Sequence, residues 1–179
     1  DWSVTGVQTC ALPISVQGAG GVKIPPSTYW PEIQRIVDKY GILLLADEVI
    51  TGFGRLGTWF ASEYYGIRPN LITFAKAITS GYIPLSGLLI DDKIVEALMS
   101  HDDDFNHGYT FSGHPVACAV GLRNIEIMQR EKLLPRVTET GAPALARMLA
   151  KFKDHPLVGE VRSVGLLGAI ELVADKKTR

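Results

Sequence analysis

Cysteine, net charge and long apolar runs are all scarce in this sequence. Its 179 residues include two cysteines, Cys10 and Cys118, and carry a formal net charge of −1. This cysteine content supports neither a disulfide framework nor a thiolate metal site, and it favours a reducing, cytoplasmic location. The near-neutral charge gives no electrostatic reason to expect nucleic acid, and apolar runs such as residues 42–46 are far too short to span a bilayer. We expect a globular chain with one domain-sized core and no nucleic-acid or membrane partner.

The beginning of the chain lacks an initiating Met, and it lacks the basic residues of a secretory leader because no Lys or Arg precedes Lys23. Residues 4–14, VTGVQTCALPI, back-translate codon by codon into a nucleotide sequence that resembles a common sequencing-library adapter. We therefore interpret residues 1–15 as an artefactual segment and expect natural sequence from about Val16. A genuine irregular N-terminus is the alternative interpretation.

Beyond residue 15, helical and strand patterns alternate, which is typical of an α/β fold. The apolar spacing predicts an amphipathic helix over residues 31–40, and further helices are expected over 92–99, 114–129 and 133–153. GILLLADEVI (41–50) and LITFAK (71–76) contain the consecutive apolar residues of central parallel strands buried on both faces. Further strands are expected in PLSGLLI (84–90) and, broken at Gly165, in VRSVGLLGAIELV (161–173).

Both buried strands deliver charged side chains to their carboxyl ends. Asp47 and Glu48 follow the first strand, and Lys76 follows the second. Open α/β sheets bind their ligands in the crevice outside these ends, so this crevice is the candidate site. Taken alone, Asp47 is also compatible with a turn cap and Lys76 with a solvated surface lysine, the commoner position of either residue type.

A competing pattern points to a different ligand. GFGRLG (52–57) satisfies the G-x-G-x-x-G signature of dinucleotide binding, but Asp47 and Glu48 precede it and would repel a pyrophosphate. The next segment, TWFASEYYGIRPN (58–70), is too short and broken for the long helix of that motif, so we expect a tight loop instead. The loop histidines lack the helical i, i+4 spacing of a ligand pair, and no metal site is expected from His101, His107 and His114.

Three segments together carry a family resemblance: ADEVITGFGRLG (46–57), FAKAITSGYIPLSG (74–87) and HGYTFSGHPVACAVGLRNIEI (107–127). In this order they resemble the class III (omega) aminotransferases, a family of fold type I that depends on pyridoxal 5′-phosphate. The resemblance implies a mostly parallel sheet with flanking helices. It also implies that residues 16–155 are part of the large cofactor-binding domain and that residues 156–179 begin the small C-terminal domain.

The resemblance also implies a role for individual residues. Lys76 forms the internal aldimine with the cofactor, Asp47 pairs with the pyridine nitrogen, Val49 packs on the ring face, and Thr110 contacts the phosphate. The chemistry needs these residue types, because a carboxylate keeps the ring protonated and a displaced lysine carries a proton as general acid and base. The expected activity moves an amino group between an amine or amino acid and a keto acid or aldehyde.

The loop that carries Thr110 reaches the partner subunit's cofactor in this family, which implies a homodimer. For Thr110 itself, an N-capping residue with no ligand is the alternative. Where the family has a strand ending in Glu-Pro before VQGAGG (16–21), this chain has Pro13, Ile14 and Ser15, so we expect that strand and its acid to be missing. The N-terminal part of the phosphate cup is also absent from the chain.

The alternatives to aminotransfer are a catalytically inactive fragment and a family member with aminomutase, racemase or decarboxylase chemistry.

Overall fold

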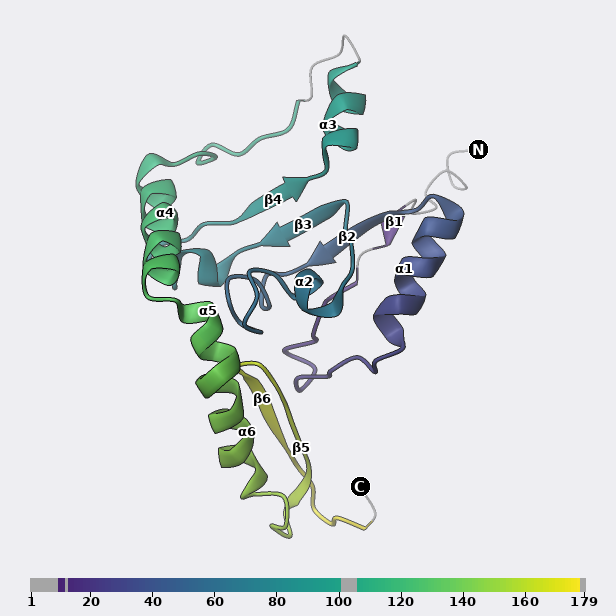
Figure 1. Cartoon of the computed structure of the whole chain (residues 1–179), viewed down its shortest axis with the longest axis vertical. Helices are drawn as coiled ribbons and strands as arrows, with labels where there is room; N and C mark the ends of the chain where they lie inside the picture. Colours follow the sequence, from purple (N-terminus) through teal and green to yellow (C-terminus); the bar gives the residue numbers. More distant parts are fainter. Residues whose placement is uncertain (1–9, 12, 101–105, 178–179) are drawn as a thin grey trace.

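The computed structural model describes residues 10–11, 13–100 and 106–177. Most of the adapter-like segment and His101 therefore lie outside the described residues. The chain is mixed α/β: one sheet has the strand order β1–β2–β3–β4, and a separate antiparallel hairpin is formed by β5 and β6 (Figure 1). The strands span Cys10–Ala11, Leu43–Asp47, Leu71–Phe74, Gly87–Ile90, Val158–Val164 and Leu167–Leu172 in that order.

The sheet is mostly parallel. β1 pairs parallel with β2, and β2 pairs parallel with β3, whereas β4 runs antiparallel to β3. Leu44 and Ala46 of β2 are fully buried, as expected for a central strand. The hairpin turns at Gly165, which has a φ of 56°, so the predicted break between the last two strands is confirmed.

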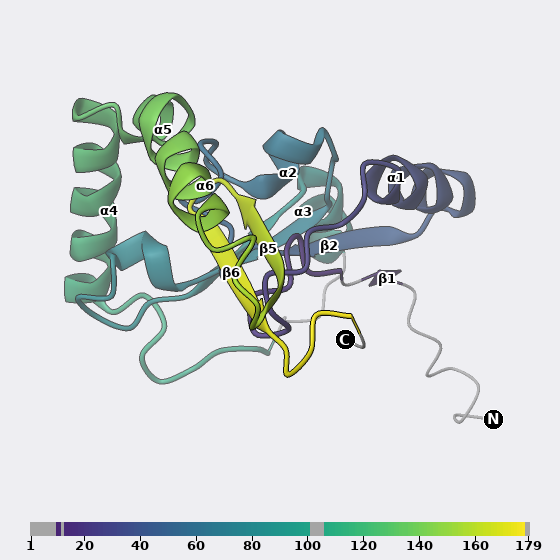
Figure 2. The same cartoon turned by 90° about the horizontal axis from the view of Figure 1, so that it is seen from below.

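Three of the predicted helices are confirmed with small shifts of their ends. The helices are α1 (Tyr29–Tyr40), α2 (Ala61–Tyr65), α3 (Asp92–Met99), α4 (Pro115–Arg130), α5 (Leu133–Arg136) and α6 (Ala142–Ala150), and a 3₁₀ turn, η1, spans Lys76–Thr79. In Figure 1, α1 and α4 lie at opposite ends of the sheet. In both views, α6 lies beside the β5–β6 hairpin (Figure 2).

The prediction of one continuous helix over residues 133–153 is wrong. A π-helical turn, η2 (Val137–Gly141), separates α5 from α6, and α6 ends at Ala150. Pro143 lies in the first turn of α6. A proline cannot donate to the carbonyl four residues earlier, here Glu139, and its ring collides with that carbonyl, so a wider turn before it relieves the conflict.

The expectation that the strand before VQGAGG is missing is also wrong. Cys10 and Ala11 of the adapter-like segment form β1 and pair with Leu43 and Leu44. A little further on, Asp47 N–H donates to the Pro13 carbonyl at 3.1 Å. Strand pairing uses backbone N–H and C=O groups, so a short segment can form an edge strand even where its side chains show no strand pattern. The glutamate that would end this strand is nevertheless absent, and Ser15 lies there fully buried.

The glycines of residues 52–57 form the predicted tight loop. Phe53 N–H donates to the Trp59 carbonyl at 2.6 Å, and Gly54 N–H donates to the Thr58 carbonyl at 3.1 Å. The helix that follows, α2, has only five residues. Leu56 of this loop belongs to a hydrophobic cluster that joins distant parts of the chain. The cluster consists of Val16, Val22, Leu56, Ala61 and Val164.

Several apolar side chains of β4 and α3 remain exposed, including Leu88, Leu89, Ile90, Leu98 and Met99. The sheet is therefore well covered at β2 and poorly covered at β4. No helix in the described part of the chain is both long and apolar enough to cross a membrane.

Tyr65, at the end of α2, gives a prediction on pH dependence. Its hydroxyl is buried without a hydrogen-bond partner among the described residues, and burial, with smaller contributions from Tyr64 and Glu48, raises the pKa of Tyr65 to about 12. A raised pKa favours the neutral phenol in the fold. This contribution to stability is present below pH of about 10, the ordinary tyrosine value, and is lost as the pH rises through about 12.

We therefore expect Tyr65→Phe to leave stability at pH 7 unchanged or to raise it by about 1 kcal/mol, because an unpaired buried hydroxyl is removed. The variant should also lose less stability than the wild type between pH 10 and pH 12. Urea unfolding followed by far-UV circular dichroism at both pH values measures the effect. Tyr40→Phe is the control, since Tyr40 is 64% exposed, and equal alkaline behaviour of the two variants would contradict the assignment.

Candidate active site

The candidate site forms where β2 and β3 end side by side. Asp47 is the last residue of β2 and pairs in register with Thr73 of β3. Glu48 N–H then donates to the Thr73 carbonyl at 3.0 Å. Three residues beyond Thr73, the chain reaches Lys76, so the parallel pairing brings the acid and the lysine to the same edge of the sheet, as predicted from the sequence.

Asp47 is partly buried and has a defined direction. Its Oδ1 accepts a hydrogen bond from Val49 N–H at 3.0 Å. This is the turn-capping contact that the sequence allowed, and it fixes the carboxylate without removing it from the crevice. Ile14 pairs with Asp47 in an isolated parallel bridge on the other side of the strand.

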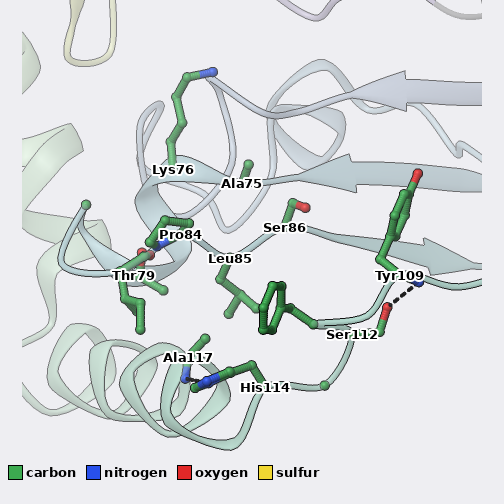
Figure 3. Close-up of a pocket in the computed structure, with 14 residues that line it drawn as sticks. Ala75, Lys76, Thr79, Pro84, Leu85, Ser86, Tyr109, Ser112, His114 and Ala117 are labelled. Carbon is green, nitrogen blue, oxygen red and sulfur yellow. Dashed lines mark hydrogen bonds between the residues drawn. The ribbon is translucent and has the colours of Figure 1, made fainter.

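Lys76 begins the 3₁₀ turn η1 and has an unusual backbone conformation. Its φ is 50°, in the left-handed region that non-glycine residues rarely adopt. The residue is exposed. In Figure 3 its side chain extends away from His114 and Ala117 of the α4 N-terminus. Residues with a strained backbone cluster at enzyme active sites, where the surrounding structure holds them in place.

Two cavities meet at Lys76. The smaller, of about 270 Å³, is lined by three of the predicted site residues, Asp47, Val49 and Lys76, together with the loop of Gln17–Gly20. The larger, of about 810 Å³, lies between η1 and the loop before α4 (Figure 3). An acid, a lysine and an apolar side chain thus surround one small cavity at the end of the sheet.

Thr110, the fourth predicted site residue, lines neither of these two cavities. It is exposed in the loop before α4. Its neighbours Tyr109 and Ser112 line the larger cavity, where Tyr109 N–H donates to Ser112 Oγ at 3.1 Å (Figure 3). The N-cap of α4 is His114, whose Nδ1 accepts from Ala117 N–H at 3.5 Å, so the alternative interpretation of Thr110 as the N-cap is wrong.

Sequence reasoning missed the structural importance of Glu48. This carboxylate is fully buried and accepts three hydrogen bonds: from Thr51 Oγ1 at 2.7 Å, from Ala61 N–H at 2.7 Å and from Ser62 N–H at 2.6 Å. It therefore satisfies the first amides of α2 and closes the loop between β2 and that helix. The available signal for this role was a second acid directly after Asp47, at the start of a long loop.

Glu48→Ala is expected to destabilise the chain by about 3 kcal/mol or more, because it leaves two buried amides without a partner. Thermal or urea unfolding followed by circular dichroism measures this loss. Glu63→Ala is a matched control on α2. Glu63 is exposed and accepts one longer hydrogen bond, from Trp59 N–H at 3.3 Å, so its loss should cost well under about 1 kcal/mol. Equal losses for the two variants would show that the buried contacts of Glu48 contribute little.

The residues around the smaller cavity fit pyridoxal 5′-phosphate in their chemistry. The cofactor needs a primary amine for its aldehyde, a carboxylate for its ring nitrogen and an apolar contact for its ring face. Lys76, Asp47 and Val49 carry groups of these kinds, and Gln17 to Gly20 also line the cavity. No second basic residue lines this cavity among the described residues.

Comparison with known proteins places the chain among aminotransferases. The sequence profile of the family described as aminotransferase class-III matches residues 4–179. The putrescine–pyruvate aminotransferase of Pseudomonas aeruginosa is 55% identical over 164 residues, which cover 92% of this chain and 36% of that protein. A mitochondrial gamma-aminobutyrate transaminase of Solanum lycopersicum is 44% identical, with 96% of this chain and 34% of that protein covered.

A solved structure shows the same architecture. The thermostable (S)-enantioselective omega-transaminase of Thermomicrobium roseum matches with a TM-score of 0.90 and 50% sequence identity. The match covers 94% of this chain and 38% of that structure. The chain thus spans little more than a third of the length of the proteins that it resembles.

Proposed function

Since the chain belongs to the class-III aminotransferase family, we propose that it is part of an enzyme that transfers an amino group between an amine or amino acid and a keto acid or aldehyde. The observation that carries the proposal is the meeting of Asp47, Val49 and Lys76 around one cavity at the carboxyl edge of the sheet. The family uses pyridoxal 5′-phosphate. When bound, this cofactor supplies an aldehyde and an electron-withdrawing ring.

Lys76 is the residue that attaches the cofactor. Lys76 lines both cavities, so substrate can approach it from the larger space. With the cofactor bound, the Lys76 amine would supply the attachment point, and Nζ would serve to accept and return a proton as general base and acid. An arginine could not replace this lysine in either task, because its guanidinium remains protonated.

Asp47 holds a proton on the ring nitrogen of the cofactor. A carboxylate about 4 Å from a cationic nitrogen contributes on the order of 4 kcal/mol at an effective dielectric constant of about 20, before desolvation. The hydrogen bond from Val49 N–H to Asp47 Oδ1 keeps the carboxylate oriented. The Val49 side chain, on the same cavity wall, packs on the ring face.

Thr110 serves the phosphate group of a second subunit's cofactor. Its exposure, and its position outside both cavities of its own chain, support a role across an interface. The complete enzyme is then a homodimer with shared sites. In this arrangement residues 16–155 belong to the large domain of fold type I, and residues 156–179 begin the small domain.

The test compares two proteins: this 179-residue chain and the same segment restored to its full reading frame. Both are assayed for keto-acid-dependent deamination with a panel of amines and amino acids that includes putrescine and gamma-aminobutyrate, for which the two relatives are named. We expect activity from the complete frame alone, because this chain spans little more than a third of the length of its relatives. No amino transfer by the complete frame, or equal specific activity from both proteins, would contradict the proposal.

A further inference from the structure

The middle of α4 contacts the turn that carries Lys76 through one polar side chain. Asn124 Nδ2 donates to the carbonyl of Ala77 at 2.9 Å and to the carbonyl of Ile78 at 3.1 Å. Its Oδ1 accepts from Ser80 Oγ at 2.8 Å. One amide therefore binds three of the four residues directly after Lys76, namely Ala77, Ile78 and Ser80, although Asn124 lies 47 residues from Ala77 along the chain.

This segment needs external support because its own backbone is strained. Lys76 and Ser80, at its two ends, both have a φ of 50°, in the left-handed region that is unfavourable for residues with a Cβ atom. The internal hydrogen bonds of the turn are few: Ile78 N–H donates to the Ala75 carbonyl at 3.4 Å, and Ser80 N–H donates to the Ala77 carbonyl at 3.1 Å. A four-residue 3₁₀ turn with these bonds has little stability of its own.

The packing of α4 explains how a short side chain reaches the turn. Gly121 lies on the helix face that meets the turn, one helical turn before Asn124. A Cβ atom at Gly121 would lie 3.0 Å from Leu85 Cδ2 and 3.5 Å from Ile78 Cγ1. The glycine thus permits a close approach of helix and turn, and this approach brings the amide of Asn124 to the carbonyls of Ala77 and Ile78.

We propose that Asn124 is a positioning residue for Lys76: its amide holds the strained turn in the conformation that directs the lysine side chain into the site. This inference rests on the proposed function, in which Lys76 attaches the cofactor. Without the amide, the backbone of the turn can relax to a negative φ at Lys76. The direction of the lysine side chain then changes, while the helix and the sheet remain in place.

The experiment measures the reactivity of individual lysines. The complete enzyme, freed of cofactor, is incubated with pyridoxal 5′-phosphate, reduced with borohydride and digested, and the initial labelling rate of each lysine-containing peptide is determined by mass spectrometry. We expect Asn124→Ala to lower the labelling rate of Lys76 roughly tenfold, the effect of losing hydrogen bonds of ordinary strength. Lys93, exposed on α3, should keep its rate, and Gln129→Ala, an exposed position of α4, should leave both rates unchanged.

Asn124→Asp is the second variant, and it decides the question if the alanine variant is unfolded by circular dichroism. Its carboxylate has the same size and still accepts from Ser80, but it cannot donate to the two carbonyls. We expect a loss of Lys76 labelling at least as large as for alanine. Unchanged Lys76 labelling in a folded Asn124 variant would overturn the positioning role alone. Lack of preferential labelling at Lys76 in the wild-type complete enzyme would instead overturn the proposed function, and the positioning role with it.

Discussion

Replacing Lys76 with alanine in the complete enzyme is expected to abolish covalent attachment of the cofactor and to lower turnover by several orders of magnitude. The physical reason is that no other described lysine lines either cavity, so no second amine can replace Nζ as the attachment point or as the general acid and base. The visible absorbance of the lysine-bound cofactor and the rate of amino transfer are the two measurements.

Lys93→Ala is the matched control for this prediction. Lys93 is an exposed lysine in the first turn of α3, and its loss should leave absorbance and turnover unchanged. Wild-type absorbance in the Lys76→Ala protein would refute the assignment of Lys76. A decrease of equal size in the Lys93→Ala protein would point to a general effect of removing a lysine.

The second large effect is expected for Asp47→Asn. The substitution preserves the shape of the side chain and its hydrogen bond from Val49 N–H, but it removes the negative charge beside the ring nitrogen. Breaking a buried ion pair in this way costs about 3 to 5 kcal/mol, so turnover of the complete enzyme should fall by roughly a hundredfold or more. Steady-state kinetics with a keto-acid acceptor measure the loss.

Asp38→Asn provides the comparison for Asp47. Asp38 lies exposed on α1 and pairs with Arg68 at 3.3 Å, an arrangement that contributes little in water. We expect no change in turnover for this variant. If Asp47→Asn retained wild-type turnover as well, the role of Asp47 would be limited to shaping the turn after β2.

The central sheet was predictable because a buried strand contains consecutive apolar residues, which are visible in the sequence. Strand β2 is apolar up to Asp47, its last residue, and the mostly apolar β3 is followed two residues later by Lys76, at the edge where ligands bind. From this pattern alone, the meeting of Asp47 and Lys76 follows. The 3.6-residue spacing of α1 and the glycine at the β5–β6 turn were equally informative.

The elements that were predicted wrongly depend on contacts that no local sequence pattern indicates. β1 forms through backbone pairing of a segment whose composition gave no reason to expect a strand. The break between α5 and α6 depends on Pro143, a proline whose effect reaches four residues back. Neither error changes the position of the site, because the pairing of β2 with β3 alone brings Asp47 and Lys76 to the same edge of the sheet.

Long-range polar contacts were the least predictable part of the site. Glu48 bonds to amides 13 and 14 residues away, and Asn124 bonds to carbonyls more than 40 residues away. Both side chains lie close in the chain or in space to residues that the sequence did identify, since Glu48 follows Asp47 and Asn124 bonds to the turn that begins at Lys76. Local patterns therefore identify the candidate site residues, whereas the long-range contacts around them emerge only from the tertiary structure.

The most direct test of the account is the location of the borohydride-reduced cofactor after peptide mapping of the complete enzyme. The account predicts one dominant modified peptide, the one that contains Lys76, and its disappearance in the Lys76→Ala protein. Modification spread over the exposed lysines in proportion to their accessibility, with no preference for Lys76, would contradict it.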